Sequence, residues 1–473
     1  MHQYAKPFVP FFDNVIDAFI PELWARETLA ILNENMVMAM LVHRDFEDEI
    51  AQWGDVVNTR KPGKFNATRK GVNDDVTTQD ATAQNVAVPL DQHLHTSFII
   101  RDGEEAKAFT SLVSDYLEPA VTSIAQKVDR IISAQVHQYV DQFAGRLQKV
   151  DATTIKSFVL EAREKLNKQL AHTQDRNLVV TPGTETAMLG LDEFTRVDAS
   201  GGADALRNGM IGRLYGFNIF MAQQTPEIDY RDTVTDVTKA AYLAGTTDIV
   251  VELAGASPFG IGDYVVVDGD DTPQLVTNVQ DGVPAGDTTL TLHPGLKRDT
   301  ASGAAVTGYK PGAVDFAAGY AVGYDKSIVT DAFDAVNGPK VGQILRFGTG
   351  AAAIDGADPI YGIVNVIPLG GGSYSIELDR PLEQAVSDNW LIAVGPSGSY
   401  NFAFHRNTLA FISRPLPQPM NGTGAQSAVI NSRGLAVRVV ITYDGMKQGH
   451  RVTVDILCGL EVLDKDLGVA MYG

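Results

Sequence analysis

Residues 116–143 read YLEPAVTSIAQKVDRIISAQVHQYVDQF and carry the longest helical pattern in the chain. Apolar side chains recur in this stretch at intervals of three and four residues, which places them on one face of an α-helix. About 30 helical residues, each rising 1.5 Å, would span roughly 45 Å. The pattern therefore predicts a long structural helix, which we call the spine helix. Its apolar residues are Leu117, Val121, Ile124, Val128, Ile131, Ile132, Tyr139, Val140 and Phe143.

The segments on both sides of the spine helix predict further helices and strands. Pro21-Glu22-Leu23-Trp24 has the features of a helix start, because proline fits the first turn and an acidic side chain is favoured there. A second helical pattern covers 153–172. Val86, Val88 and Leu90 alternate as in a strand, and Leu178-Val179-Val180 forms a short apolar run typical of a buried strand.

The end of the chain predicts a β-hairpin. A strand-like run covers 435–442, and a second one covers 452–457. Between them Tyr443-Asp444-Gly445 carries the Asp-Gly pair that tight turns prefer.

Residues 54–81 are polar, contain glycine, and separate their charges along the chain. A basic group comes first and an acidic group follows, which predicts a long extended hairpin without a core of its own. Such a long loop is usually functional or disordered. The basic group is Arg60, Lys61, Lys64, Arg69 and Lys70, and the acidic group is Asp74, Asp75 and Asp80.

Two interpretations of this charged hairpin are open. It can be a solvated surface loop, or its basic half can pair with the acidic half of the same hairpin in a neighbouring copy of the chain. Each exposed ion pair contributes only ~0–1 kcal/mol. Repeated around a closed symmetric assembly, such pairs would still fix the register between neighbours and exclude wrong ones.

Residues 226–400 differ in composition from the rest of the chain. They hold 23 acidic and 9 basic residues, a net charge of −14, and are rich in Gly, Asp, Thr and Val. A weak internal repeat relates 248–250 to 327–329 and 289–296 to 375–382. Short strands separated by turns at this spacing predict two small β-barrels or sandwiches in tandem.

The overall composition narrows the class of protein. The chain has 473 residues, 38 basic against 58 acidic ones, and a net charge of −20. This balance argues against tight wrapping of nucleic acid, which needs clustered Lys and Arg. The single cysteine, Cys458, excludes an internal disulfide framework and a thiolate metal cluster. No apolar stretch approaches the ~20 residues of a membrane span, and no signal peptide follows Met1.

Motifs with catalytic or metal-binding chemistry are weak. His93 and His95 could share one strand face, but two partly exposed histidines are the simpler interpretation. Asp268-Gly269-Asp270-Asp271 resembles part of a calcium loop and is better explained as a hairpin turn, since it lacks the distal Glu. Cys458 lies in an apolar strand and reads as a buried, inert thiol. We therefore expect no enzyme, no metal site and no cofactor.

Several short stretches, taken in their order along the chain, form a recognisable series. They are Ile20–Trp24, Leu41–Phe46 with Gly54–Val57, Leu90–His95 through Ile100–Glu104, Ile211–Phe217, Asn401–Arg406 with Arg414–Leu416, and Tyr443–Gly445 with Asp455–Gly459. Taken together, their order and spacing resembles the tailed-bacteriophage major capsid (coat) protein family. The resemblance frames about 300 residues, 1–225 and 401–473, and is similar to the short-tailed-phage branch with an inserted β domain.

This resemblance implies an α+β fold of the tailed-phage major capsid type with an inserted all-β region. It places an N-terminal arm in 1–51, an extended loop in 52–85, and a peripheral domain with the spine helix (115–145) in 86–175. The axial domain would comprise 176–225 and 401–434, the tandem β-barrel-like insertion 226–400, and the C-terminal hairpin of the peripheral domain 435–473.

The resemblance also implies a function. Copies of the chain would assemble into hexamers and pentamers of an icosahedral shell that encloses double-stranded DNA in the virion. The DNA would be held without specific binding, which suits an acidic coat, and the acidic insertion would face outward or lie between capsomers. The capsid motifs begin almost at Met1, so we expect a separate scaffolding protein. A portal protein and a decoration protein are further expected partners, and a membrane is not.

Two alternatives to a viral coat are kept. The first is an encapsulin-like shell protein of a cellular nanocompartment, which genomic neighbours would separate from a phage coat. The second, from a different class, is a calcium-dependent carbohydrate-binding or hydrolytic β-protein. Stabilisation on titration with calcium would favour it.

Overall fold

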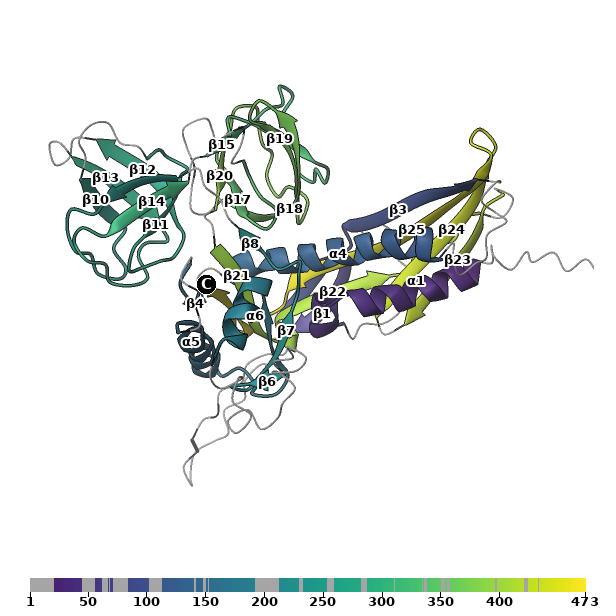
Figure 1. Cartoon of the computed structure of the whole chain (residues 1–473), viewed down its shortest axis with the longest axis horizontal. Helices are drawn as coiled ribbons and strands as arrows, with labels where there is room; N and C mark the ends of the chain where they lie inside the picture. The colour runs from purple at the N-terminus through teal and green to yellow at the C-terminus, as the bar shows by residue number, and fades with distance from the viewer. Residues whose placement is uncertain are drawn as a thin grey trace, which may run out of the picture.

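The computed structural model describes most of the chain. The described residues are 21–44, 56–61, 67, 69–70, 84–101, 113–139, 142–147, 150–151, 153–191, 212–228, 233–252, 259–281, 287–309, 311–333, 335, 338–349, 354, 358–395, 398–420, 424–432 and 434–473. They form a body of two sheets with helices and, beside it, two small β modules (Figure 1). Among them, no helix is both long enough and apolar enough to span a bilayer.

The first sheet of the body is a long antiparallel one that carries the spine helix. Figure 1 shows this helix and α1 (Pro21–Asn35) running along the sheet. The spine helix comprises a π-helical turn (Val113–Leu117), α4 (Glu118–Ala134) and a 3-10 turn (Gln135–Tyr139). The strands are β3 (Gln92–Arg101), β22 (Leu409–Arg414), β23 (Gln426–Ser432), β24 (Leu435–Asp444) and β25 (Gly449–Val462).

The predicted apolar face of the spine helix is the buried face. Leu117, Val121, Ile124, Val128 and Ile132 have at most 3% of their surface exposed, and they pack with α1 and the sheet in one core. Burial of this stripe stabilises the helix on the sheet, at about 25 cal/mol per Å² of apolar surface. The predicted β-hairpin at the chain end is confirmed, because β24 and β25 pair antiparallel from Arg438–Asp455 to Asp444–Gly449.

The second sheet of the body mixes parallel and antiparallel strands. Its order is β4–β26–β21–β5–β7–β6, and β8 pairs with β21. The helices α5 (Ile155–Lys168) and α6 (Pro182–Leu189) belong to it, and α5 packs its apolar face onto β5, β21 and β26. The strands are β4 (Phe143–Gly145), β5 (Arg176–Val180), β6 (Arg213–Leu214), β7 (Phe217–Met221), β8 (Glu227–Ile228), β21 (Gly398–His405) and β26 (Gly468–Tyr472).

Two β modules lie between β8 and β21 in the chain. In the first module the strand order is β10–β13–β12–β11–β14–β9, and in the second a barrel closes in the order β15–β16–β19–β18–β17–β20. The first module contains β9 (Thr233–Val237), β10 (Asp248–Glu252), β11 (Tyr264–Val267), β12 (Gln274–Asp281), β13 (Asp287–His293) and β14 (Ala305–Tyr309). The second contains β15 (Gly312–Val314), β16 (Ile328–Asp331), β17 (Ile344–Phe347), β18 (Ile360–Gly370), β19 (Ser373–Leu378) and β20 (Leu391–Val394).

The two modules have the same topology, strand for strand. The one difference in pairing is that β9 and β10 meet only at the isolated bridge Thr238–Val251, whereas β15 and β16 form a ladder. The same tyrosine contact recurs: the Val250 N–H donates to Tyr242 Oη (2.7 Å), and the Val329 N–H donates to Tyr320 Oη (2.8 Å). The weak sequence repeat thus corresponds to two copies of one six-stranded fold.

Three expectations from the sequence need correction. Phe143 continues the helical spacing but lies in β4, because the helical run ends at Tyr139 and β4 pairs with β26. Segment 401–434 does not belong to one unit: β21 joins the mixed sheet, whereas β22 and β23 join the antiparallel sheet. Segment 435–473 also divides, because β26 leaves the hairpin and pairs with β21.

Candidate assembly surface

The charged hairpin begins as a regular two-stranded ladder. β1 (Val56–Lys61) and β2 (Gln84–Pro89) pair antiparallel, from Val56 opposite Pro89 to Lys61 opposite Gln84. Beneath the ladder Val88 and Leu90 are fully buried against β22 and β25. The ladder therefore places Lys61 and Gln84, the two ends of the predicted loop, opposite each other.

The described residues include only some of those that the sequence predicts as contacts between subunits. Arg60 and Lys61 occupy the last two positions of β1, opposite Asn85 and Gln84. Arg69 and Lys70 are exposed. The remaining predicted residues, Lys64, Asp74, Asp75 and Asp80, lie outside the described residues. The basic group therefore begins where the ladder ends, and its pairing with the acidic group stays a prediction.

A buried carboxylate fastens the N-terminal segment to the spine helix. Asp129 of α4 accepts hydrogen bonds from the Val37 N–H (2.8 Å) and the Ala39 N–H (3.3 Å), at the start of the short helix α2 (Met38–Leu41). Burial raises the pKa of Asp129 to about 6, although these hydrogen bonds favour its charged form. The described part of the predicted N-terminal arm, 21–44, is thus packed on the body of its own chain.

The first β module is attached to the mixed sheet through the turn 268–271. This turn joins β11 to β12, as the sequence predicts. Arg146 Nη1 contacts the Asp271 carboxylate at 3.2 Å, and the Leu147 N–H donates to the Asp271 carbonyl (3.1 Å). Arg298 donates to the carbonyls of Asp270 (2.8 Å) and Gly145 (2.7 Å). The polar turn is therefore an attachment point, which motif analysis did not reveal.

The second barrel is attached to the spine helix through a set of contacts that we call the barrel junction. Gln135 Nε2 donates to Asp379 Oδ2 (2.9 Å), and Gln92 Nε2 donates to the Asp379 carbonyl (3.2 Å). Lys127 forms an ion pair with Glu377. The junction is defined by these residues together with Asp91, Ala134, Gly362, Arg380, Glu383 and Glu461.

Aromatic side chains fill the space between the body and the first module. Tyr400 and Tyr472 meet edge to face with ring centroids 5.6 Å apart, and His137 meets Tyr400 in the same way at 5.8 Å. Tyr309 of the first module belongs to the same core. Burial lowers the pKa of His137 to about 3 and raises that of Tyr400, so neither side chain is charged near neutral pH. The module therefore shares a buried core with the body.

The weak chemical motifs have structural roles where the chain is described. His93 Nε2 lies 3.4 Å from Asp455, whose carboxylate also binds Arg438. Cys458 is buried, and burial raises the pKa of its thiol. Within the described residues no group of three or more His, Cys, Asp or Glu side chains has the arrangement of a metal site.

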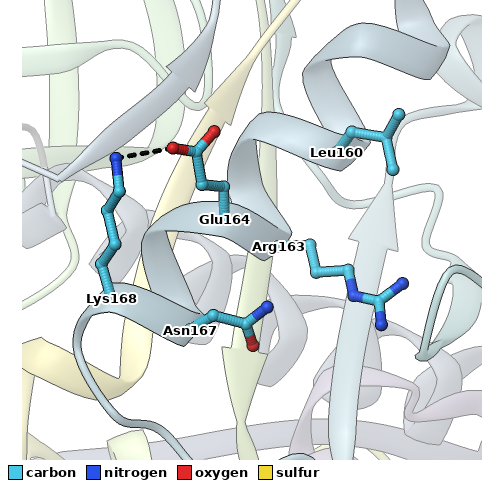
Figure 2. A pocket seen from close by; sticks show the side chains of 5 residues that line it. All are labelled: Leu160, Arg163, Glu164, Asn167 and Lys168. Carbon is cyan, nitrogen blue, oxygen red and sulfur yellow. Dashed lines mark ion pairs between the residues drawn. The ribbon is translucent and has the colours of Figure 1, made fainter.

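A shallow groove lies on the exposed face of α5. It has a volume of about 460 Å³, and Figure 2 shows its five lining residues, Leu160, Arg163, Glu164, Asn167 and Lys168. Lys168 and Glu164 form an ion pair at 2.6 Å across one turn of the helix. Ligand sites are concave and enclose most of a small molecule. A groove lined by one helix face does not do so, and we treat it as surface.

Comparison with known proteins finds similarity among solved structures. No protein-family model and no curated protein matches the chain. One similar structure is from Mycobacterium phage Che8, with 13% identity, a TM-score of 0.40, and coverage of 92% of this chain and 90% of that one. The capsid structure of Cyanophage P-SCSP1u has 10% identity, a TM-score of 0.40, and coverage of 91% and 90%. The mature capsid of bacteriophage PhiM1 has 9% identity, a TM-score of 0.38, and coverage of 93% and 87%.

Proposed function

We propose that this chain is a major capsid protein of a tailed bacteriophage. Copies of it would form hexamers and pentamers of an icosahedral shell around double-stranded DNA, without catalysis. The supporting observation is the elongated first sheet: a helical run of 113–139 and α1 lie along it, and the β1–β2 hairpin leaves it. The motif order in the sequence, which resembles that of tailed-phage coat proteins, supports the same function.

The two sheets of the body suggest the two domains of a capsid subunit. The antiparallel sheet with the spine helix and α1 would be the peripheral domain. The mixed sheet with α5 and α6 would be the axial domain near the capsomer centre. Compared with the division expected from the sequence, this assignment moves β22 and β23 from the axial to the peripheral domain and β26 from the peripheral to the axial domain.

The charged hairpin is the proposed contact between neighbouring subunits. Residues 60–70 hold five basic side chains and no acidic one, in a chain of net charge −20. A neighbour with acidic side chains at 74–80 offers complementary charge. Because closed symmetry repeats each contact, pairs that are weak singly can select the register of the shell.

Removal of the hairpin tests this proposal. Lys61 and Gln84 face each other at the end of the ladder, so an Asn-Gly turn can replace 62–83 without disturbing β1 and β2. The variant should keep the thermal midpoint of the complete chain within a few degrees and should fail to sediment as shells, when both are expressed with the neighbouring reading frames. Shells of normal size from the variant would contradict the proposed contact.

A charge-reversal experiment distinguishes ion pairing by the hairpin from the simple effect of deleting it. Substitution of the five basic residues by Glu should block assembly. A second variant, which in addition carries Lys at Asp74, Asp75 and Asp80, should recover it, because the two halves have then exchanged signs. If both variants assemble like the unmodified chain, the hairpin charges do not set the contact.

A further inference from the structure

The barrel junction brings carboxylates together from the two parts that it joins. Asp91, just before β3, and Glu461 on β25 belong to the body, whereas Asp379 and Glu383 follow β19 in the second barrel. The Asp379 side chain is fully buried. Arg380 binds the barrel carboxylates, with Nη1 3.1 Å from Asp379 and Nε 2.7 Å from Glu383. The same guanidinium also acts on Glu461, whereas Asp91 has no such cation among the groups that act on it.

Burial at this junction favours the uncharged forms of the acids. Desolvation, with smaller contributions from the charges of Asp379 and Glu461, raises the pKa of Asp91 to about 6. Desolvation likewise raises the pKa of Asp379 and of Glu461. The other ionisable groups that act on this cluster are Cys458 on β25, His137 in the 3-10 turn, Lys465 after β25, Tyr139 and Tyr361.

We propose that this cluster makes the attachment of the second barrel to the body depend on pH, firm in mild acid and weaker at neutral pH. Asp91 adjoins Gln92, whose side chain reaches Asp379 across the junction, and an ionised Asp91 is repelled by the charges of Asp379 and Glu461. Protonation removes this repulsion. The hydrogen bond from Gln92 to the Asp379 backbone carbonyl does not titrate, so the barrel is loosened at neutral pH rather than released.

The direction of the pH dependence follows from the linkage between proton binding and folding. Folding raises the pKa of Asp91 above its value of 3.8 in the unfolded chain. A group of this kind contributes stability that is complete below the unfolded value and is lost as the pH rises through about 6. The change therefore falls between about pH 4 and about pH 7.

Hydrogen exchange on the unassembled full-length chain tests the proposal. The reporter is the Gly362 N–H, which donates to Asp379 Oδ1 (2.9 Å) at the junction, and the β16–β19 ladder inside the barrel is the internal reference. The protection factor of the reporter should fall by roughly 3-fold to 100-fold between about pH 5 and about pH 7.5. The reference should change less. Equal protection of the reporter at both pH values would overturn the proposal.

Two variants assign the effect to the cluster. Asp91→Asn should remove most of the pH dependence of the reporter, and Asp248→Asn, on the exposed end of β10, should leave it unchanged. If Asp91→Asn does not fold, Asp91→Ala carries the same expectation, because it also leaves no titrating group at this position. If the protection of the reporter still depends on pH in the folded variant, the proposal is overturned. Because the chain is measured before assembly, this outcome is independent of the capsid function.

Discussion

At the scale of single residues, Asp129 shows how the spine helix organises its surroundings. Its side chain is buried and accepts hydrogen bonds from two backbone N–H groups of the N-terminal segment. Without this acceptor, the first turn of α2 would leave buried donors unpaired, which costs about 1–3 kcal/mol per group. One carboxylate on the long helix therefore holds a segment some 90 residues earlier in the chain.

Asp129→Ala should lower the free energy of unfolding by about 1–3 kcal/mol, because the N–H groups of Val37 and Ala39 lose their acceptor. The midpoint of chemical denaturation measures this, with the fluorescence of Trp24, buried on α1, as the probe. Asp115→Ala, at the start of the same helical run and exposed, is the matched control. Equal midpoints for both variants would show that Asp129 does not fasten the segment.

At the scale of elements, the packing of β18 on the spine helix requires a glycine. A Cβ atom at Gly362 would lie 2.3 Å from the Cβ of Ala134, closer than two carbon atoms can approach. The barrel and the helix are therefore in contact without an intervening side chain. The backbone at position 362 does not have a positive φ, so the close approach to Ala134 is the reason that a glycine is required there.

Gly362→Ala should force the second barrel away from α4 and cost about 1–3 kcal/mol, as overpacking of a close contact does. Gly260→Ala is the control, because a Cβ atom there meets open space. Limited proteolysis and the thermal midpoint measure the effect. A Gly362→Ala chain that resists protease as well as the control variant would contradict the close packing.

The elements differ in how far the sequence predicts them. The spine helix, α1, α5 and the β24–β25 hairpin follow from local periodicity, because one face of each is buried. The division of 401–434 between two sheets does not, since β21 pairs with β5 and β26, whereas β22 pairs with β25. Such pairing is set by partners far along the chain. Phe143 departs from its local pattern for the same reason: its spacing fits a helix, but it lies in β4 and pairs with Ala470 of β26.

The candidate surface divides in a similar way. The charge separation of the hairpin and its ladder could be predicted, because both are local. The junction contacts could not, since Gln135 and Asp379, or Arg298 and Gly145, are far apart in sequence and carry no motif. Buried polar groups of this kind are recognised only when their partners are known.

At the scale of the whole molecule, the β modules are fixed to the body rather than tethered to it. Tyr309 of the first module belongs to the core that contains Tyr400 and Tyr472 of the body. Tyr264, Leu275 and Ile344 join the two modules to each other in a smaller core. If the proposed capsid function holds, the acidic residues 226–400 should therefore stay together in the shell, and we propose that they face outward or lie between capsomers.

Cryo-electron microscopy of the chain, expressed alone and with the neighbouring reading frames, tests the capsid function most directly. The account predicts closed icosahedral shells built of hexamers and pentamers, with the spine helix as a rod in each subunit and residues 226–400 as paired β modules on the outer surface or between capsomers. Monodisperse monomers in both samples would contradict it.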